Sequence, residues 1–163
     1  MNWSAAKSIV RASLLLLALV GAMQSVSLAQ SDNSRDSRIV GVWDVQVTLR
    51  NCTTQAPLPS GFRGLHKYEL GGTAQIVPST NPALLSPHVG VWKETEKDAY
   101  GLVFKMFRFD PAGLNIGWVV VHNDVVINED ATQYAGTGRA DTFDSNGNLV
   151  GASCPIFAGV RLE

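Results

Sequence analysis

After residue 30, short runs of β-branched, aliphatic and aromatic residues alternate with turn sequences, and no apolar repeat of helical period is present. In the clearest run, residues 40–51, Trp43, Val45 and Val47 alternate with polar neighbours, which predicts a strand with one buried face. Further runs lie at about 64–70, 73–77, 89–95, 100–109, 115–127, 133–143 and 149–162. Short strands at such regular spacing indicate an all-β sandwich or barrel.

The sequences between the runs favour tight connections. Gly71-Gly72 can supply the positive φ angles of a hairpin turn. Asp110-Pro111-Ala112-Gly113 is typical of a type I turn, and Asn146-Gly147 is a strong hairpin signal. Eight strands joined mainly by short turns predict an antiparallel up-and-down meander, which loses its exposed edges if it closes into a barrel.

Residues 1–29 have the pattern of a secretory signal peptide. Lys7 and Arg11 precede the apolar run 14–20, and Ser27-Leu28-Ala29 predicts cleavage after Ala29. The alternative is an uncleaved membrane anchor, but this apolar run is much shorter than the roughly 20 residues that span a bilayer. We therefore expect an exported protein, periplasmic or extracellular, with a flexible polar arm at 30–38 and one barrel domain at 39–163.

Charge and motif content argue against several classes of function. The chain has 13 Lys and Arg residues against 14 Asp and Glu residues and no basic cluster, so nucleic-acid binding is not expected. No second apolar stretch of membrane length follows the leader. His66, His88 and His122 do not share a metal-ligand spacing. Without a G-x-S-x-G elbow or a Gly-rich phosphate loop, the sequence gives little support for catalysis, and no cofactor is expected.

The two cysteines, Cys52 and Cys154, lie just after the first run and early in the last run. An even pair in an exported protein predicts a disulfide. If the cysteines lie opposite each other in an antiparallel pair of strands, Val45 faces Arg161, and Trp43 lies diagonal to Arg161. Such first-to-last pairing closes a barrel, whereas a sandwich remains the alternative.

The same pairing turns an apolar stripe in the last run outward. This stripe indicates either an association surface or a register that is wrong by one residue. It consists of Ile156, Ala158, Val160 and Leu162.

Gly41-Val42-Trp43 resembles the G-x-W signature of lipocalins, and Arg161 resembles the arginine that packs across that tryptophan at the barrel base. The segments 86–92, 143–149 and 161–162 extend the likeness to a family of secreted bacterial lipocalin-like (calycin-type) proteins with no assigned activity. The resemblance implies an eight-stranded antiparallel up-and-down β-barrel. The chain differs from full-length lipocalins in being shorter and in showing no C-terminal helix.

The barrel topology predicts which end is open. The odd-numbered connections of a meander meet at one end, and they include the two longest loops, 52–63 and 78–88, together with the disulfide. Apolar residues in or beside these loops, Phe62, Leu84 and Leu85, either line a ligand pocket or cap a filled core.

His88 and Arg108 are the polar candidates at this end. Arg108 continues the face of Tyr100, Leu102, Phe104 and Met106, and an inward Arg108 could bind a ligand carboxylate. The opposite face of the same run is also apolar, so the sequence leaves its orientation open. His122 and Asp124 are expected to face solvent.

The leading hypothesis is therefore an exported binding protein for a small apolar molecule held at the barrel mouth. A second hypothesis is a protein-binding module such as a protease inhibitor, whose polar arm at 30–38 would enter the target. A third is a cofactor-free cyclase or isomerase, which would need a buried, paired ionisable group inside the barrel.

Overall fold

A computed structural model describes residues 37–163, which form nine β-strands and no helix. The leader predicted at 1–29 and most of the arm predicted at 30–38 lie outside the described residues. Ser37 and Arg38 belong to the folded domain, two residues before its expected start, because Ser37 is buried and Arg38 pairs with Asp98. The strands are β1 (Gly41–Thr48), β2 (Phe62–Tyr68), β3 (Thr73–Pro78), β4 (His88–Glu96), β5 (Ala99–Phe109), β6 (Asn115–Ile127), β7 (Gln133–Phe143), β8 (Leu149–Ser153) and β9 (Ile156–Arg161).

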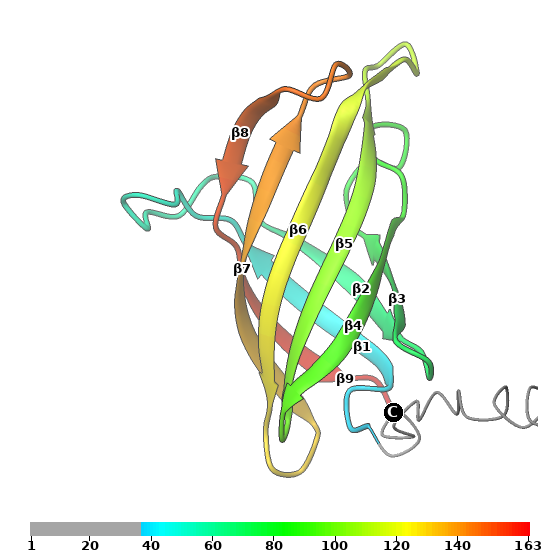
Figure 1. The fold of residues 1–163 in the computed structure, drawn as a ribbon, viewed down its shortest axis with the longest axis vertical. Coiled ribbons are helices and arrows are strands. Elements are labelled where there is room, and N and C mark those ends of the chain that lie inside the picture. The colour runs from blue at the N-terminus through cyan, green and yellow to red at the C-terminus, as the bar shows by residue number, and fades with distance from the viewer. Residues whose placement is uncertain (1–36) are drawn as a thin grey trace, which may run out of the picture. The chain divides into compact units, whose positions relative to one another are not determined.

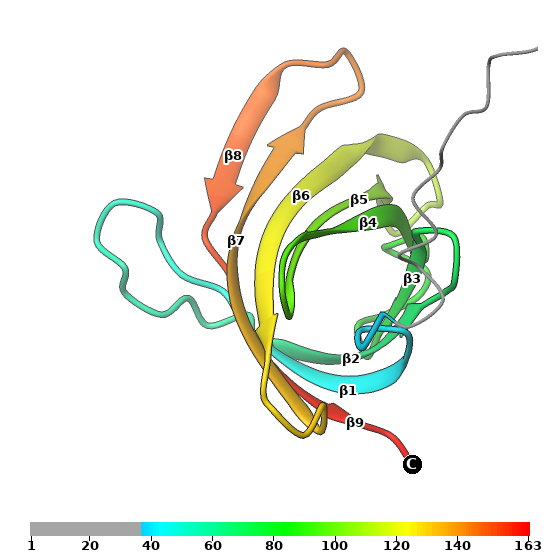
Figure 2. The ribbon, with the colours of Figure 1, turned by 60° about the horizontal axis from the view of Figure 1, so that its bottom comes forward.

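The strands form a closed antiparallel barrel (Figures 1 and 2). Each strand from β1 to β7 pairs with the next along the chain, and β9 lies between β7 and β1. First-to-last pairing thus closes an eight-stranded wall, so the barrel prediction is confirmed and the sandwich alternative is wrong. β8 is an additional strand that pairs with β7 alone within the described part of the chain.

The predicted last strand, residues 149–162, is wrong in one respect, because it consists of two strands. β8 pairs with the second half of β7, and β9 pairs with the first half. The break falls at Cys154 and Pro155, where proline has no N–H group to donate to a ladder. Cys154 instead donates its backbone N–H group to the Arg50 carbonyl oxygen at 2.9 Å.

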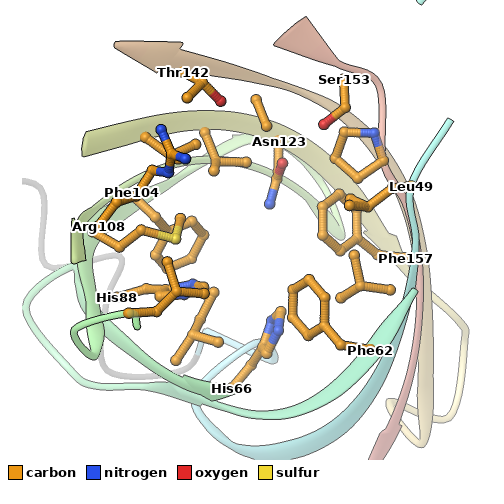
Figure 3. Close-up of a pocket in the computed structure, with 18 residues that line it drawn as sticks. Leu49, Phe62, His66, His88, Phe104, Arg108, Asn123, Thr142, Ser153 and Phe157 are labelled. Carbon is orange, nitrogen blue, oxygen red and sulfur yellow. The ribbon is translucent and has the colours of Figure 1, made fainter. Parts of the chain in front are cut away.

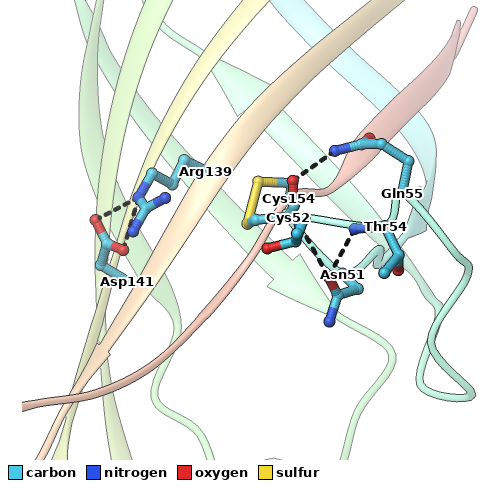
Figure 4. The surroundings of a disulfide bond; sticks show 8 residues. Asn51, Cys52, Thr54, Gln55, Arg139, Asp141 and Cys154 are labelled. Atoms are coloured by element: carbon cyan, nitrogen blue, oxygen red, sulfur yellow. Dashed lines mark hydrogen bonds and ion pairs between the residues drawn. A yellow bond between two sulfur atoms is a disulfide. The ribbon is translucent and has the colours of Figure 1, made fainter.

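The Cys52–Cys154 disulfide is present, with the two Cα atoms 4.9 Å apart. It lies outside the β1–β9 ladder, because β1 ends at Thr48 and β9 begins at Ile156. The cysteines therefore do not set the register between these strands. Figure 4 shows Asn51 beside the disulfide, where its side-chain oxygen accepts the backbone N–H groups of Thr53 and Thr54.

The register predicted from opposed cysteines is wrong by two residues. Trp43 pairs directly with Arg161, instead of lying diagonal to it, and Val45 pairs with Gly159. A shift of two residues leaves every side chain on its predicted face, because side chains alternate with a period of two. Val160 and Leu162 are accordingly exposed, so the outward stripe does not arise from a one-residue error.

Trp43 and Arg161 close the base of the barrel. The Trp43 side chain is fully buried, and the Arg161 guanidinium lies 4.2 Å from the centre of its ring, which is cation–π geometry. The guanidinium also donates hydrogen bonds to the carbonyl oxygens of Ala131 at 2.7 Å, Val40 at 2.8 Å and Arg38. One side chain thus joins both ends of the barrel domain to the β6–β7 turn.

Gly41 has a steric role in this base. Its φ angle is +135°, which side-chain-bearing residues rarely adopt, and a Cβ atom there would lie 2.6 Å from Nη1 of Arg161. The Gly41-Val42-Trp43 sequence therefore provides both the ring under the guanidinium and the space beside it.

Replacing Arg161 with methionine is expected to lower the free energy of unfolding by about 2–4 kcal/mol, because three carbonyl oxygens lose their charged donor. Arg161→Lys keeps the charge but offers a single ammonium, so we expect a smaller loss. Urea denaturation of the three proteins tests this, and equal stability of wild type and Arg161→Met would contradict the assigned role.

Candidate functional site

A cavity of about 190 Å³ lies inside the barrel, toward the end that carries the long connections (Figure 3). An engineered protein cavity of about 150 Å³ accommodates benzene, so this space suits a molecule of one or two small rings. Most of the wall is aliphatic or aromatic. The cavity is lined by Val47, Leu49, Phe62, His66, Ile76, Leu85, His88, Phe104, Met106, Arg108, Val119, Val121, Asn123, Ala140, Thr142, Ser153, Pro155 and Phe157.

The space exists because β7 carries small side chains on its inward face. The inward positions after Tyr134 are Gly136, Gly138, Ala140 and Thr142, and the last two line the cavity. At the base, bulky inward residues such as Trp43 and Tyr134 pack edge-to-face, with ring centres 5.0 Å apart. The barrel is therefore packed at its base and open in its upper half.

Gly138 makes room for a polar side chain on the neighbouring strand. A Cβ atom at Gly138 would lie 2.1 Å from Oδ1 of Asn123. The Asn123 side chain is only 5% exposed, and its Oδ1 atom has no hydrogen-bond partner among the described residues. With Oδ1 against β7, the amide nitrogen points toward the centre of the cavity (Figure 3).

His66 lies at the floor of the cavity in a network with two tyrosines. Its Nδ1 atom lies 3.0 Å from the Tyr134 hydroxyl and 3.2 Å from the Tyr68 hydroxyl, and the two hydroxyls lie 3.3 Å apart. Burial, assisted by nearby His88, lowers the pKa of His66 to about 3, and burial raises the pKa of both tyrosines. At neutral pH all three groups are therefore uncharged.

Counting protons assigns the His66 tautomer. If Nδ1 accepts, Tyr134 donates to Nδ1 and Tyr68 donates to the Tyr134 oxygen, so each hydroxyl proton has an acceptor. If Nδ1 carried the proton, it could only donate, and one phenol would have no acceptor within the network. We therefore place the proton on Nε2. That atom is buried, has no partner in the described part of the chain, and belongs to a cavity-lining side chain.

His88 is a second buried histidine in the wall. Ile76 of β3 pairs with both His66 and His88, so the two imidazoles lie two strands apart across the barrel wall. The His88 side chain is buried, and burial lowers its pKa to about 4. Its Nε2 atom also has no hydrogen-bond partner among the described residues.

Arg108 lines the cavity near its mouth. It is the penultimate residue of β5, and its backbone forms a bridge with Leu85 of the long β3–β4 connection. The side chain is half-buried, and within residues 37–163 it makes no salt bridge. The structure resolves the orientation that the sequence left open: the alternate residues from Tyr100 to Met106 are buried and face inward, whereas Val103 and Phe107 are exposed.

Four of the five predicted mouth residues line one cavity: Phe62, Leu85, His88 and Arg108. Leu84 does not line it, since its side chain is 38% exposed in the connection outside the wall. Most of the other lining residues were not predicted as site residues, and His66 and Asn123 are the two among them with buried polar atoms that lack a partner in the described part of the chain. His122 and Asp124 are exposed on the outer surface of β6, as expected.

Within the described part of the chain, no group of three or more His, Cys, Asp or Glu residues is arranged to hold a metal ion. Among residues 37–163, no helical segment has the length and apolar character needed to span a bilayer. Comparison with known proteins finds no matching family model, curated protein or solved structure.

Proposed function

We propose that this chain is an exported, lipocalin-like binding protein that holds a small, largely apolar ligand inside its barrel. The observation that carries the proposal is the cavity of about 190 Å³, which the chain's own side chains leave at the long-loop end. Eight-stranded barrels either fill their interior with side chains or hold one small ligand. A mostly apolar, concave wall with a few convergent polar groups is typical of ligand sites.

Two features support export. The leader at 1–29 has the charge, apolar core and cleavage sequence of a signal peptide. The Cys52–Cys154 disulfide is the type of bond that persists in oxidising compartments such as the periplasm or the extracellular space. The lipocalin-like assignment rests on the barrel and on the Gly41-Val42-Trp43 and Arg161 base.

Filling the cavity is expected to weaken binding. Ala140→Leu places an isobutyl group on the cavity wall, so we expect the affinity for indole, a neutral apolar probe, to fall about tenfold or more, equivalent to about 1.4 kcal/mol. Ala135→Leu is the matched control, because Ala135 lies on the outer face of the same strand. Isothermal titration of the three proteins, each checked for an unchanged fold by circular dichroism, measures the effect.

Native mass spectrometry of protein purified from its own host tests the proposal without a chosen probe. A bound small molecule, released by Ala140→Leu and retained by Ala135→Leu, is the expected result. Recovery of ligand-free protein, together with no indole binding by the wild type, would refute the proposal.

The cyclase or isomerase hypothesis has one specific observation in its favour. It requires a buried, paired ionisable group in the interior, and the His66–Tyr68–Tyr134 network is one. A neutral imidazole that donates from Nε2 can polarise a substrate carbonyl. Incubating the extracted host ligand with fresh protein separates the two functions, because a binder returns it unchanged and an enzyme converts it. The inhibitor hypothesis depends on the arm at 30–38, which lies mostly outside the described residues.

A further inference from the structure

The polar groups at the cavity floor are hydrogen-bond donors. The His66 tautomer leaves Nε2–H without a partner among the described residues, and the side chain is only 1% exposed. Asn123 projects from the opposite wall with its amide nitrogen toward the same space (Figure 3). A buried donor without an acceptor costs about 1–3 kcal/mol. A ligand oxygen placed between the two side chains would satisfy both donors.

The cavity wall carries positive charge and no negative charge. Among the described residues, no Asp or Glu lines the cavity, and Arg108 is the one lining residue that is charged at neutral pH. His66 and His88 are uncharged there because burial lowers their pKa values to about 3 and about 4. In an apolar surrounding, a guanidinium attracts an anion more strongly than it does in bulk water. Its planar donor pair also matches the two oxygens of a carboxylate.

The charged and uncharged donors are separated along the barrel. His66 lies at the centre of β2 and pairs with Trp43, so it sits on the packed base layer. Arg108 lies beyond Met106 on the inward face of β5, toward the mouth. Between them the wall is apolar, with Phe62, Phe104 and Val121 among its members. A ligand that matches this wall has an apolar middle and an oxygen function at each end.

We propose that the ligand is a small amphipathic acid. Its carboxylate, or a comparable oxyanion, pairs with Arg108 at the mouth, its apolar body fills the cavity, and an oxygen acceptor at its far end receives hydrogen bonds from His66 and Asn123. This inference rests on the proposed binding function and adds the chemical class and the orientation of the ligand.

Matched naphthalene probes test the charge preference. 2-Naphthoate, naphthalene-2-carboxamide and 2-naphthylmethylammonium share one apolar body and differ in charge. We expect the carboxylate to bind about 10- to 100-fold more tightly than the carboxamide, and the ammonium to bind most weakly. Isothermal titration at neutral pH and low salt gives the three dissociation constants.

Variants of Arg108 and Asn123 test which residues cause these preferences. Arg108→Met should abolish the advantage of 2-naphthoate over the carboxamide, and Arg139→Met should preserve it, because Arg139 is an exposed arginine that pairs with Asp141. The extra hydroxyl of 6-hydroxy-2-naphthoate should add about 3- to 10-fold in affinity. That gain should become smaller in Asn123→Leu, which replaces the amide by an apolar side chain of similar size and leaves His66 as the one donor to the hydroxyl oxygen.

The outcomes distinguish a failure of the acid-ligand inference from a failure of the proposed binding function. Indole binding combined with equal affinities for the three naphthalene probes, or with tightest binding of the ammonium, would overturn the acid-ligand inference alone. A carboxylate preference that survives in Arg108→Met would overturn it as well. Absence of binding for indole and for all naphthalene probes would overturn the binding function too. Thermal unfolding of each variant verifies that the barrel is folded.

Discussion

Acidification from about pH 6 to about pH 4 is expected to lower the free energy of unfolding by about 4 kcal/mol through His66 and His88 alone. Both side chains are buried, with 1% and 4% exposure. Burial lowers the pKa of His66 to about 3 and that of His88 to about 4, whereas an unfolded histidine titrates near its ordinary value of 6.5. This is the largest pH effect that we expect near physiological conditions.

The direction follows from proton binding in the two states. Between about pH 6.5 and pH 4, the unfolded chain binds a proton at each histidine and the folded chain does not. Stability therefore rises with pH across this window and is lost as the pH falls below 6.5. The contribution of His88 levels off near its folded pKa of about 4, and that of His66 levels off about one unit lower.

Urea denaturation at half-unit pH steps measures the effect. The expected slope is about 2–3 kcal/mol per pH unit near pH 5.5, corresponding to nearly two protons taken up on unfolding. A His66→Gln/His88→Gln protein lacks both titrating groups, and the amide introduced in place of His66 can still accept from Tyr134, so its slope should be much flatter. Similar slopes in the two proteins would show that these histidines are not the source.

Removal of the disulfide is expected to have the second large effect. Replacing Cys52 and Cys154 together by alanine should lower the free energy of unfolding by about 4–5 kcal/mol. The bond joins residues 102 positions apart, so it restricts the unfolded chain over most of the barrel domain. Small domains commonly have total stabilities of about 5–15 kcal/mol, so this change would remove a large share.

Denaturant unfolding of the oxidised wild type and the double alanine variant tests this expectation. If the bond acts through the unfolded state, the variant should also show a larger m value, because its unfolded chain is less compact. Reductant should shift the wild type toward the variant and leave the variant unchanged. A loss below about 1 kcal/mol would contradict the chain-entropy explanation.

The strand pattern and the faces of several strands could be predicted because alternation is a local property. In β5, alternation places Arg108 on the same face as Tyr100 and Met106, but both faces are apolar and the sequence does not say which one is inward. In β6, by contrast, the valines at 119, 121 and 125 identify the inward face. This alternation also places Asn123 inward, so the signal for that site residue was present in the sequence.

His66 could not be recognised from its neighbours. In β2 the inward residues are Phe62, Gly64, His66 and Tyr68, whereas the apolar Leu65 faces solvent with 46% exposure. Leu65 shares this outward face with Arg63 and Lys67, so the alternation in β2 is compatible with an inward His66 but does not show what His66 contacts. His66 faces inward because β1 pairs it with Trp43, and Tyr134, from a distant part of the chain, completes its hydrogen bonds.

The two-residue register error has a related origin. The cysteines identify which strands meet, but a disulfide beyond the end of a ladder leaves the register free. Leu84 shows the same limit at the mouth. Its apolar character matches that of Leu85, yet only Leu85 lines the cavity, because the Leu85 backbone bridges to Arg108.

From the sequence alone we could establish an all-β chain, and we could predict closure of its first strand on its last, with a sandwich as the alternative, and the end at which the long loops meet. These follow from alternation, turn residues and cysteine position, all of which are readable along the chain. The interior cavity and the donors that face into it become visible only in the folded barrel. Cavity volume depends on which side chains meet across the barrel, and His66 of β2 faces the same cavity as Asn123 of β6 only after strands that are far apart in the sequence have paired.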